Sequence, residues 1–316
     1  NAASTTQSNN TVSLNDQAAP TITGTTVAGN NSTIAVTFSE AVFNATGGSG
    51  ALEASDFALS ISGGTATVAA TPSSISISGN VYTLGLTLTG TPTGSETLTV
   101  VPSGATAIYD ASDNAASTTQ SNNTVSLNDQ ASPTMVITST TSGVSSGATS
   151  NDATIAMKFT SNESTSNLIA GDVTVTNGSI GALSGSGSVY TATLTPDGSG
   201  AVTVKISAGA YSDAAGNTNT VSNTFTWTYD GTLPTITGTT VAGNNSTIAV
   251  TFSEAVFNAT GGSGALEASD FALSISGGTA TVAATPSSIS KSGNVYTLGL
   301  TLSLIHISEP TRRKRI

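Results

Sequence analysis

The chain has 316 residues, a formal net charge of −11 and no cysteine, and only 8% of its residues are charged. The absence of cysteine excludes disulfides and thiol chemistry, and no apolar run approaches the roughly 18 residues of a membrane-spanning helix. An acidic surface of this kind disfavours nucleic acid and anionic membranes as partners and favours divalent cations.

The sequence repeats itself. Residues 20–88 return as residues 234–302 with one substitution, and residues 1–18 return as residues 114–131. The repeating unit of about 100–113 residues is too long for a solenoid repeat and is typical of an independent β-domain. Catalytic chains rarely carry two near-identical copies of one domain, so the repeat favours a string of modules.

Both ends of the chain predict a fragment of a longer protein. We interpret residues 1–19 as the last strand of a truncated preceding repeat. At the other end the repeat stops after Leu302, and the run from there to Arg312 resembles a translated transposon-end sequencing adapter. We therefore treat residues 303–316 as a non-native tail that is excluded from the fold; a genuine basic tail is the alternative.

Removing this tail changes which chemistry the chain can perform. The only histidine and all three arginines lie in it, and the remainder has three lysines against 17 carboxylates, a charge of about −14. Serine–histidine and cysteine–histidine nucleophiles and arginine-assisted phosphoryl transfer are then unavailable. Carboxylate pairs could cleave glycosides, but carboxylates that recur in every module fit structure better. We predict that the chain is not an enzyme.

Apolar and polar residues alternate with a period of two in short runs bounded by Gly, Asn, Ser and Pro, which predicts an all-β chain. Residues 20–132 are expected to form the first complete domain, residues 133–232 the second, and residues 233–302 a truncated copy of the first. The predicted strands of the first domain are 21–27, 33–39, 56–61, 65–69, 81–88, 96–101 and 118–127. Those of the second domain are 134–140, 154–160, 172–176, 189–195, 201–207 and 221–229.

Six or seven short strands in about 100 residues are typical of an immunoglobulin-like β-sandwich. The two domain types also share landmarks, such as TIAVTF with TIAMKF and GNVYT with GSVYT, so we interpret them as divergent members of one fold. The predicted fold class is all-β, with tandem immunoglobulin-like β-sandwich domains in a rod.

These landmarks resemble the bacterial Ig-like domain repeats of large surface proteins and adhesins. The resemblance rests on an Asp-x-x-x-Pro-Thr linker beginning at Asp129 and again at Asp230, on VTFSEAV at 36–42 and on SDAAGN at 212–217. The first repeat departs from the pattern, with Asp113-Asn114-Ala115 in place of Ala-Gly-Asn. The resemblance implies a tandem surface module, and families of this kind place calcium at domain junctions.

The carboxylates are the only side chains whose chemistry suggests a functional site. In a seven-stranded sandwich the entering linker, the end of the second strand and the turn before the last strand meet at one pole. Acids there crowd and repel unless a hard cation joins them, and oxygen-only ligands suit calcium; ordinary turn chemistry is the alternative. The candidate metal ligands are Asp16, Glu40, Asp110 and Asp113 in the first domain, and Asp129, Glu163, Asp213 and Asn217 in the second, with Asp172 as a further possibility.

The predicted function is a structural spacer of a large secreted or cell-surface bacterial protein, an adhesin, with calcium-stiffened junctions. An accessory or glycan-binding module of a secreted enzyme is the alternative, although the chain has few aromatic residues for glycan binding. The expected partners are the neighbouring Ig-like repeats of the same chain, with a cell-surface or glycan ligand bound by regions outside this fragment. The expected location is extracellular or the cell surface.

Overall fold

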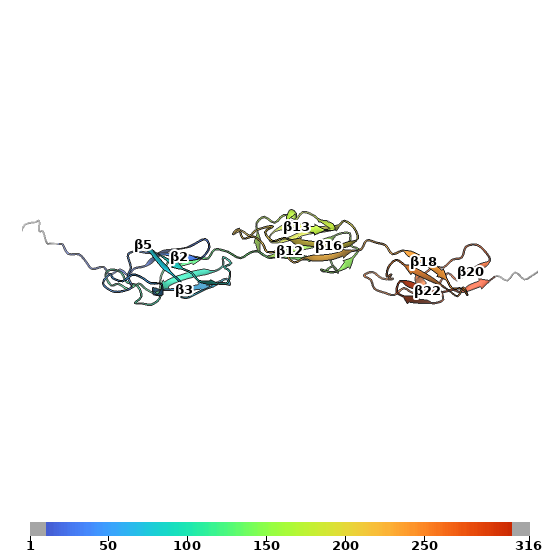
Figure 1. The fold of residues 1–316 in the computed structure, drawn as a ribbon, viewed down its shortest axis with the longest axis horizontal. Coiled ribbons are helices and arrows are strands. Elements are labelled where there is room, and N and C mark those ends of the chain that lie inside the picture. The colour runs from blue at the N-terminus through green and yellow to red at the C-terminus, as the bar shows by residue number, and fades with distance from the viewer. Residues whose placement is uncertain (1–10, 305–316) are drawn as a thin grey trace, which may run out of the picture.

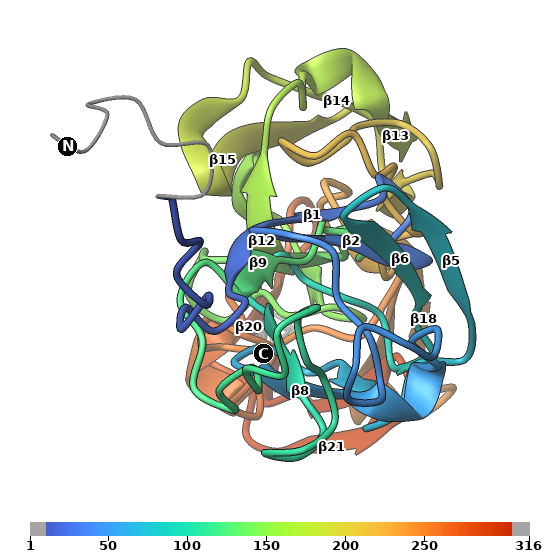
Figure 2. The ribbon, with the colours of Figure 1, turned by 90° about the vertical axis from the view of Figure 1, so that its left-hand side faces the viewer.

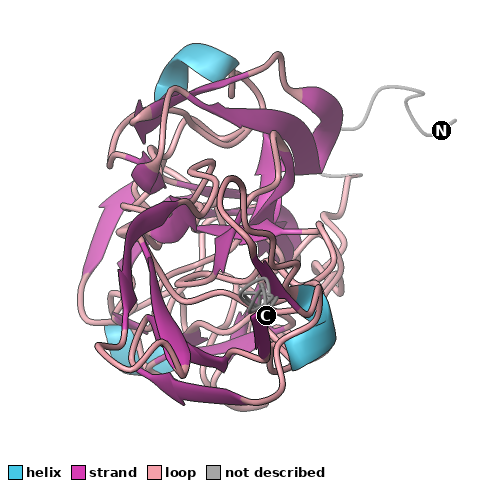
Figure 3. Cartoon of the chain, turned by 90° about the vertical axis from the view of Figure 1, so that its right-hand side faces the viewer, coloured by secondary structure: helices cyan, strands magenta, loops and turns pink. Residues whose placement is uncertain are grey.

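A computed structural model describes residues 11–304, which form three β-domains that follow one another along the longest axis of the molecule (Figure 1). Regular structure in this range consists of β-strands and three single 3-10 turns, which are drawn as cyan helices in Figure 3, and the described residues contain no α-helix. The 3-10 turns are η1 (Ala54–Asp56), η2 (Ala170–Asp172) and η3 (Ala268–Asp270). Correspondingly, none of the described residues forms a helix long and apolar enough to cross a bilayer.

The first domain is a sandwich of two antiparallel layers (Figure 2). One sheet has the order β1-β2-β6-β5; the facing layer is a three-stranded sheet of order β3-β8-β9, beside a short β4-β7 pair. The strands are β1 (Ile22–Val27), β2 (Thr33–Phe38), β3 (Phe57–Ser62), β4 (Thr67–Val68), β5 (Ile75–Ser78), β6 (Val81–Gly85), β7 (Leu88–Thr89), β8 (Thr97–Pro102) and β9 (Thr124–Ser126).

The alternating pattern explains why these strands form a core. In β2 the side chains of Ile34 and Val36 are fully buried, and on the facing layer Leu98 and Val100 of β8 are buried to the same extent. Because successive side chains on a strand point to opposite faces, the alternate residues point away from this core and are only partly buried; they are Thr33, Ala35 and Thr37 in β2 and Thr97 and Thr99 in β8.

The second domain has the same two-layer plan with four strands in each sheet. The orders are β10-β12-β15-β14 and β11-β17-β16-β13, in which only the β11–β17 pair is parallel. Its core contains Trp227, which is 1% exposed. The strands are β10 (Met135–Ser139), β11 (Thr149–Ser150), β12 (Ile155–Thr165), β13 (Val173–Thr176), β14 (Gly178–Ile180), β15 (Ser184–Pro196), β16 (Gly200–Ile206) and β17 (Phe225–Tyr229).

The third domain keeps one sheet of the first domain and loses most of the other. The sheet β18-β19-β22-β21 matches its counterpart, whereas residues 271–276, an identical copy of β3, form no strand. In the first domain β3 pairs along its whole length with β8, and the described part of the third domain supplies no equivalent partner. The strands are β18 (Ile236–Val241), β19 (Thr247–Phe252), β20 (Ala280–Val282), β21 (Ile289–Ser292), β22 (Val295–Gly299) and β23 (Leu302–Leu304).

The missing layer also exposes the core of the third domain. Ile236 is 59% exposed, whereas its copy Ile22 is 1% exposed. The last strand nevertheless runs beyond the predicted boundary at residue 302, because Ser303 and Leu304 continue the ladder with β20. A β-ladder forms through backbone hydrogen bonds, so it continues here although the residues after Leu302 differ from those after Leu88. The remainder of the expected tail, residues 305–316, lies outside the described residues, as do residues 1–10 of the expected N-terminal strand.

Candidate metal centres at the domain junctions

The linker between the first and second domains is held on both sides. The N–H of Gln130 donates to the carbonyl of Pro92 in the first domain at 2.9 Å, and the N–H of Thr220 donates to the carbonyl of Pro133 at 3.0 Å. Only residues 131 and 132 lie between these two anchored positions. Asp129 therefore sits at a short junction with little freedom to swing.

Asp129 meets two carboxylates of the second domain. One oxygen from each of Asp129, Glu163 and Asp213 lies within 4.8 Å of the other two. Glu163 comes from the distal part of β12, and Asp213 from the turn before β17, where the N–H of Asp213 donates to the carbonyl of Asn217 at 3.1 Å. The linker, the C-terminal end of β12 and the turn before β17 thus converge at one pole of the second domain.

The same arrangement occurs at the entrance of the first domain. One oxygen from each of Asp16, Glu40 and Asp110 lies within 4.8 Å of the others. Asp16 precedes β1, Glu40 follows β2, and Asp110 lies in the loop between β8 and β9. In both clusters the acid from the last loop is the most buried, with Asp110 fully buried and Asp213 4% exposed. Two domains of divergent sequence therefore build the same three-carboxylate cluster.

Asparagine side chains orient the buried acid in each cluster. The N–H and the Nδ2 of Asn217 donate to the two carboxylate oxygens of Asp213 at 2.8 and 2.9 Å. In the first domain the N–H and Nδ2 of Asn114 donate to Asp110 at 2.8 and 2.7 Å. Asn217 was predicted as a metal ligand. In the structure its side-chain nitrogen faces Asp213 and donates a hydrogen bond to it. Its counterpart Asn114 was not among the predicted site residues, although the shared Asp-x-x-x-Asn spacing could have identified it.

Two other predicted positions lie outside the clusters. Asp113 accepts a hydrogen bond from the N–H of Gly47 and has a φ of 71°; it occupies the place of Gly216, which also has a positive φ of 93°. Asp113 is therefore a turn residue and is not gathered with the other three acids. Asp172 accepts a hydrogen bond from the N–H of Ile169 at 2.9 Å and caps a 3-10 turn, which accounts for its carboxylate.

Crowding of the carboxylates affects the pKa of the glutamate in each cluster. Burial raises the pKa of Glu163, and the charges of Asp129 and Asp213 raise it further. Burial, followed by the charges of Asp110 and Asp16, likewise raises the pKa of Glu40.

Asp110 behaves in the opposite way. Burial acts to raise its pKa, but hydrogen bonds from the side chain and backbone of Asn114 and from the backbone of Ser112 outweigh burial and lower the pKa. The cluster at Asp16 thus combines one acid whose ionised form is stabilised, Asp110, with one whose ionised form is disfavoured, Glu40.

These donor sets fit a hard divalent cation. Calcium binds carboxylate oxygens at about 2.3–2.6 Å, so two ligands on opposite sides of one ion are separated by at most about 5 Å. The 4.8 Å limit on the oxygen separations is compatible with that geometry. Without a cation, two charges about 5 Å apart repel by roughly 3 kcal/mol at an effective dielectric constant near 20. A divalent ion would remove this repulsion.

The third junction offers fewer acids. Asp230 and Glu254 line one open pocket of about 470 Å³ together with Ser150 and Asn151. Among residues 11–304, no third carboxylate joins these two in a cluster. The loop that would supply it corresponds to the one carrying Asp110 in the first domain.

The comparisons with known proteins address the fold of these domains. Residues 129–229 match the family described as "Bacterial Ig-like domain". No curated protein matches the sequence.

Two solved structures resemble the chain at low identity. The surface layer protein SbsC, domains 1–6, is 15% identical with a TM-score of 0.27, over 90% of this chain and 51% of that one. Invasin, described as a bacterial integrin-binding protein, is 14% identical with a TM-score of 0.28, over 88% and 53%. The chain thus spans about half the length of both. The match to the bacterial Ig-like domain family covers the second domain of this chain.

Proposed function

We propose that the chain is a non-catalytic spacer segment of a large secreted or cell-surface bacterial protein, an adhesin, and that calcium stiffens its domain junctions. The observation that carries the proposal is the repeated cluster at Asp16 and at Asp129, in which a linker acid meets two acids of the domain that follows. A cation held by all three would tie the linker to that domain.

The contacts of Asp129 with both domains support this role for an ion. Asp129 packs against the first domain, where a side chain added at Gly94 would lie 3.3 Å from the Cβ of Asp129, while its carboxylate faces Glu163 and Asp213 of the second domain. Binding an ion there would remove the remaining freedom of residues 131 and 132. The affinity is expected to be weak, roughly 10⁻⁴–10⁻³ M as in other extracellular modules.

Aromatic residues do not favour the glycan-binding alternative. Trp227, the sole tryptophan, is 1% exposed, and Tyr82, Tyr190 and Tyr296 are buried in the three cores. Flat stacking on sugars needs exposed rings, so these four residues support packing instead; Phe257 of the third domain is 45% exposed.

The test is small-angle scattering of the full chain at low protein concentration, with calcium and with a chelator. Calcium should lengthen the particle and narrow its distribution of shapes, and Asp129→Ala combined with Asp213→Ala should remove the response at that junction. Asp197→Ala is the matched control, because Asp197 is an exposed acid in the β15–β16 turn outside the cluster. If chelator changes neither shape nor thermal stability, the acids are turn residues and the calcium proposal fails.

A further inference from the structure

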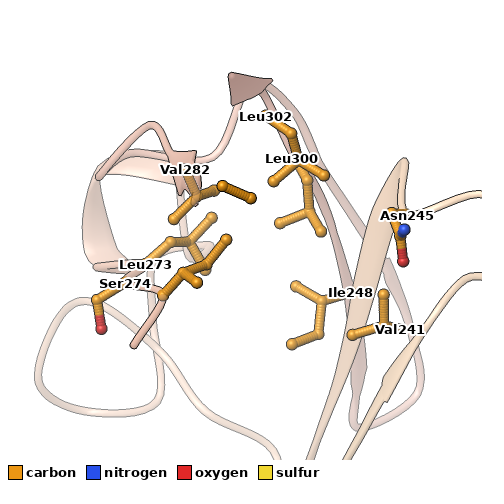
Figure 4. Close-up of a pocket in the computed structure, with 10 residues that line it drawn as sticks. Val241, Asn245, Ile248, Leu273, Ser274, Val282, Leu300 and Leu302 are labelled. Atoms are coloured by element: carbon orange, nitrogen blue, oxygen red, sulfur yellow. The ribbon is translucent and has the colours of Figure 1, made fainter. Parts of the chain in front are cut away.

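The third domain has an open apolar groove of about 370 Å³. Figure 4 shows Leu273 and Val282 facing Ile248 and Val241 across it. It is also lined by Asn245, Ser274, Ile275, Ala280, Leu300 and Leu302.

In the first domain the identical surface is covered. Ile34, the copy of Ile248, is fully buried, and Asn31, the copy of the exposed Asn245, is 2% exposed. The cover comes from β8 and from the segment around β9, which contributes Leu127 to the core. The groove is therefore the surface that these two segments occupy in an intact copy.

The chain carries a second copy of the β9 segment. Residues 11–18 are identical to residues 124–131. Val12 and Leu14 are 84% and 91% exposed, whereas Leu127, the counterpart of Leu14, is 2% exposed. Residues 11–18 form no strand. An apolar strand sequence thus lies in solvent at one end of the molecule, and the surface that binds its twin is open at the other end (Figure 1).

The first domain shows how the segment is held. Asn128 and Asn31 bind reciprocally: the Nδ2 of Asn31 donates to the carbonyl of Asn128 at 2.8 Å, and the N–H of Asn128 donates to Oδ1 of Asn31 at 2.9 Å. The hydroxyl of Thr25 donates to the carbonyl of Thr124 at 2.9 Å. In the third domain Asn245 keeps the φ of 56° that Asn31 has, so the receiving backbone is already in the bound conformation.

We propose that residues 11–15 of a second copy of this chain bind in the groove of the third domain, in the place that β9 takes in the first. Leu14 enters the groove as Leu127 enters the first core, and Asn15 pairs with Asn245 as Asn128 pairs with Asn31. The apolar groove and the asparagine pair supply these contacts; the backbone ladder of β9 in the first domain is made with β8, which has no copy in the described part of the third domain.

The placement of the two surfaces fixes the form of the assembly. Because the segment and the groove lie at opposite ends of an elongated molecule (Figure 1), the contact is heterologous and each copy can bind two others. Heterologous contacts that do not close produce open chains. We therefore expect head-to-tail oligomers that grow with protein concentration.

The test compares the full chain with its Leu14→Asp variant by sedimentation velocity over a wide range of concentrations. The unmodified chain should form longer species as concentration rises, and an excess of a synthetic peptide of residues 1–18 should disperse them. Leu14→Asp should remain monomeric. Leu233→Asp is the matched control, since Leu233 is 81% exposed and lies outside the groove, and it should assemble normally.

Hydrogen exchange locates the contact within the same molecule. The peptide should slow amide exchange in β18 and leave exchange in the identical β1 of the first domain unchanged. The peptide with the Leu14→Asp change should slow exchange in neither strand. Equal sedimentation of the chain and its Leu14→Asp variant, or slowing of β1 and β18 alike, would overturn the proposal.

Discussion

Asn217 holds Asp213 from two directions, with its backbone N–H on one carboxylate oxygen at 2.8 Å and its side-chain amide on the other at 2.9 Å. Asn114 makes the same pair of contacts with Asp110. The carboxylate from the loop before the last strand is therefore held in one orientation. The linker acid and the glutamate complete the cluster around it.

This relationship predicts a selective effect on calcium binding. Asn217→Ala should weaken binding at the Asp129 junction by roughly 10-fold or more, as loss of partners behind metal ligands commonly does, and leave the Asp16 junction unchanged. Asn114→Ala should do the reverse. Calorimetric titration of the full chain with calcium measures both sites. A uniform loss at both junctions in either variant would contradict a local positioning role.

The raised pKa of Glu163 predicts how pH affects the metal-free second domain. When a folded-state pKa lies above the unfolded value, the folded state holds more protons between the two values, so stability falls as pH rises through that window. Without calcium, the second domain should lose stability as pH rises above about 4.5. Glu163→Gln should flatten that dependence, and calcium should reverse it at higher pH. Thermal unfolding in chelator across this range provides the measurement.

Glu96 of the first domain predicts the opposite pH dependence. It is fully buried, and burial acts to raise its pKa, but hydrogen bonds from the N–H groups of Ala66, Thr93 and Thr65 outweigh burial and lower the pKa to about 2. Its contribution, roughly 3 kcal/mol for such a shift, is complete above pH 4.5 or so and is lost as pH falls toward 2. Calorimetric unfolding of the chain and of Glu96→Gln should show this acid-sensitive part in the unmodified chain alone.

A pair of glycines supplies the control for Glu96. Gly64 and Gly278 are copies with positive φ values of 57° and 74°, so replacement by alanine strains both backbones similarly. A Cβ at Gly64 would also clash with the carboxylate of Glu96, whereas a Cβ at Gly278 would meet nothing within 4 Å. Gly64→Ala should therefore destabilise its domain more than Gly278→Ala. Equal losses of stability would show that the backbone, not the carboxylate, sets the cost.

Alternation and repeats predicted most of the strands, since half-buried strands such as β2 and β8 carry a clear period of two. The sequence did not predict β5, β11 and β14, which lie at sheet edges and bury little apolar surface. The clusters at Asp16 and Asp129 could be predicted because topology alone brings three loops to one pole. Asp113 was wrongly placed with them, because counting acids along a turn does not reveal which residue takes the left-handed position.

The copies of β3 show where sequence stops determining structure. Residues 57–62 and 271–276 are identical, yet only the first set forms a strand, because a strand needs a partner and β8 supplies it. Amide exchange at 271–276 should therefore be much faster than at 57–62, and exchange in β18 faster than in β1. Measurement at low protein concentration by mass spectrometry compares the copies in one sample, so solvent conditions cancel. Similar protection of the two copies would mean that residues 271–276 find a partner strand in solution, and that the groove beside them is closed.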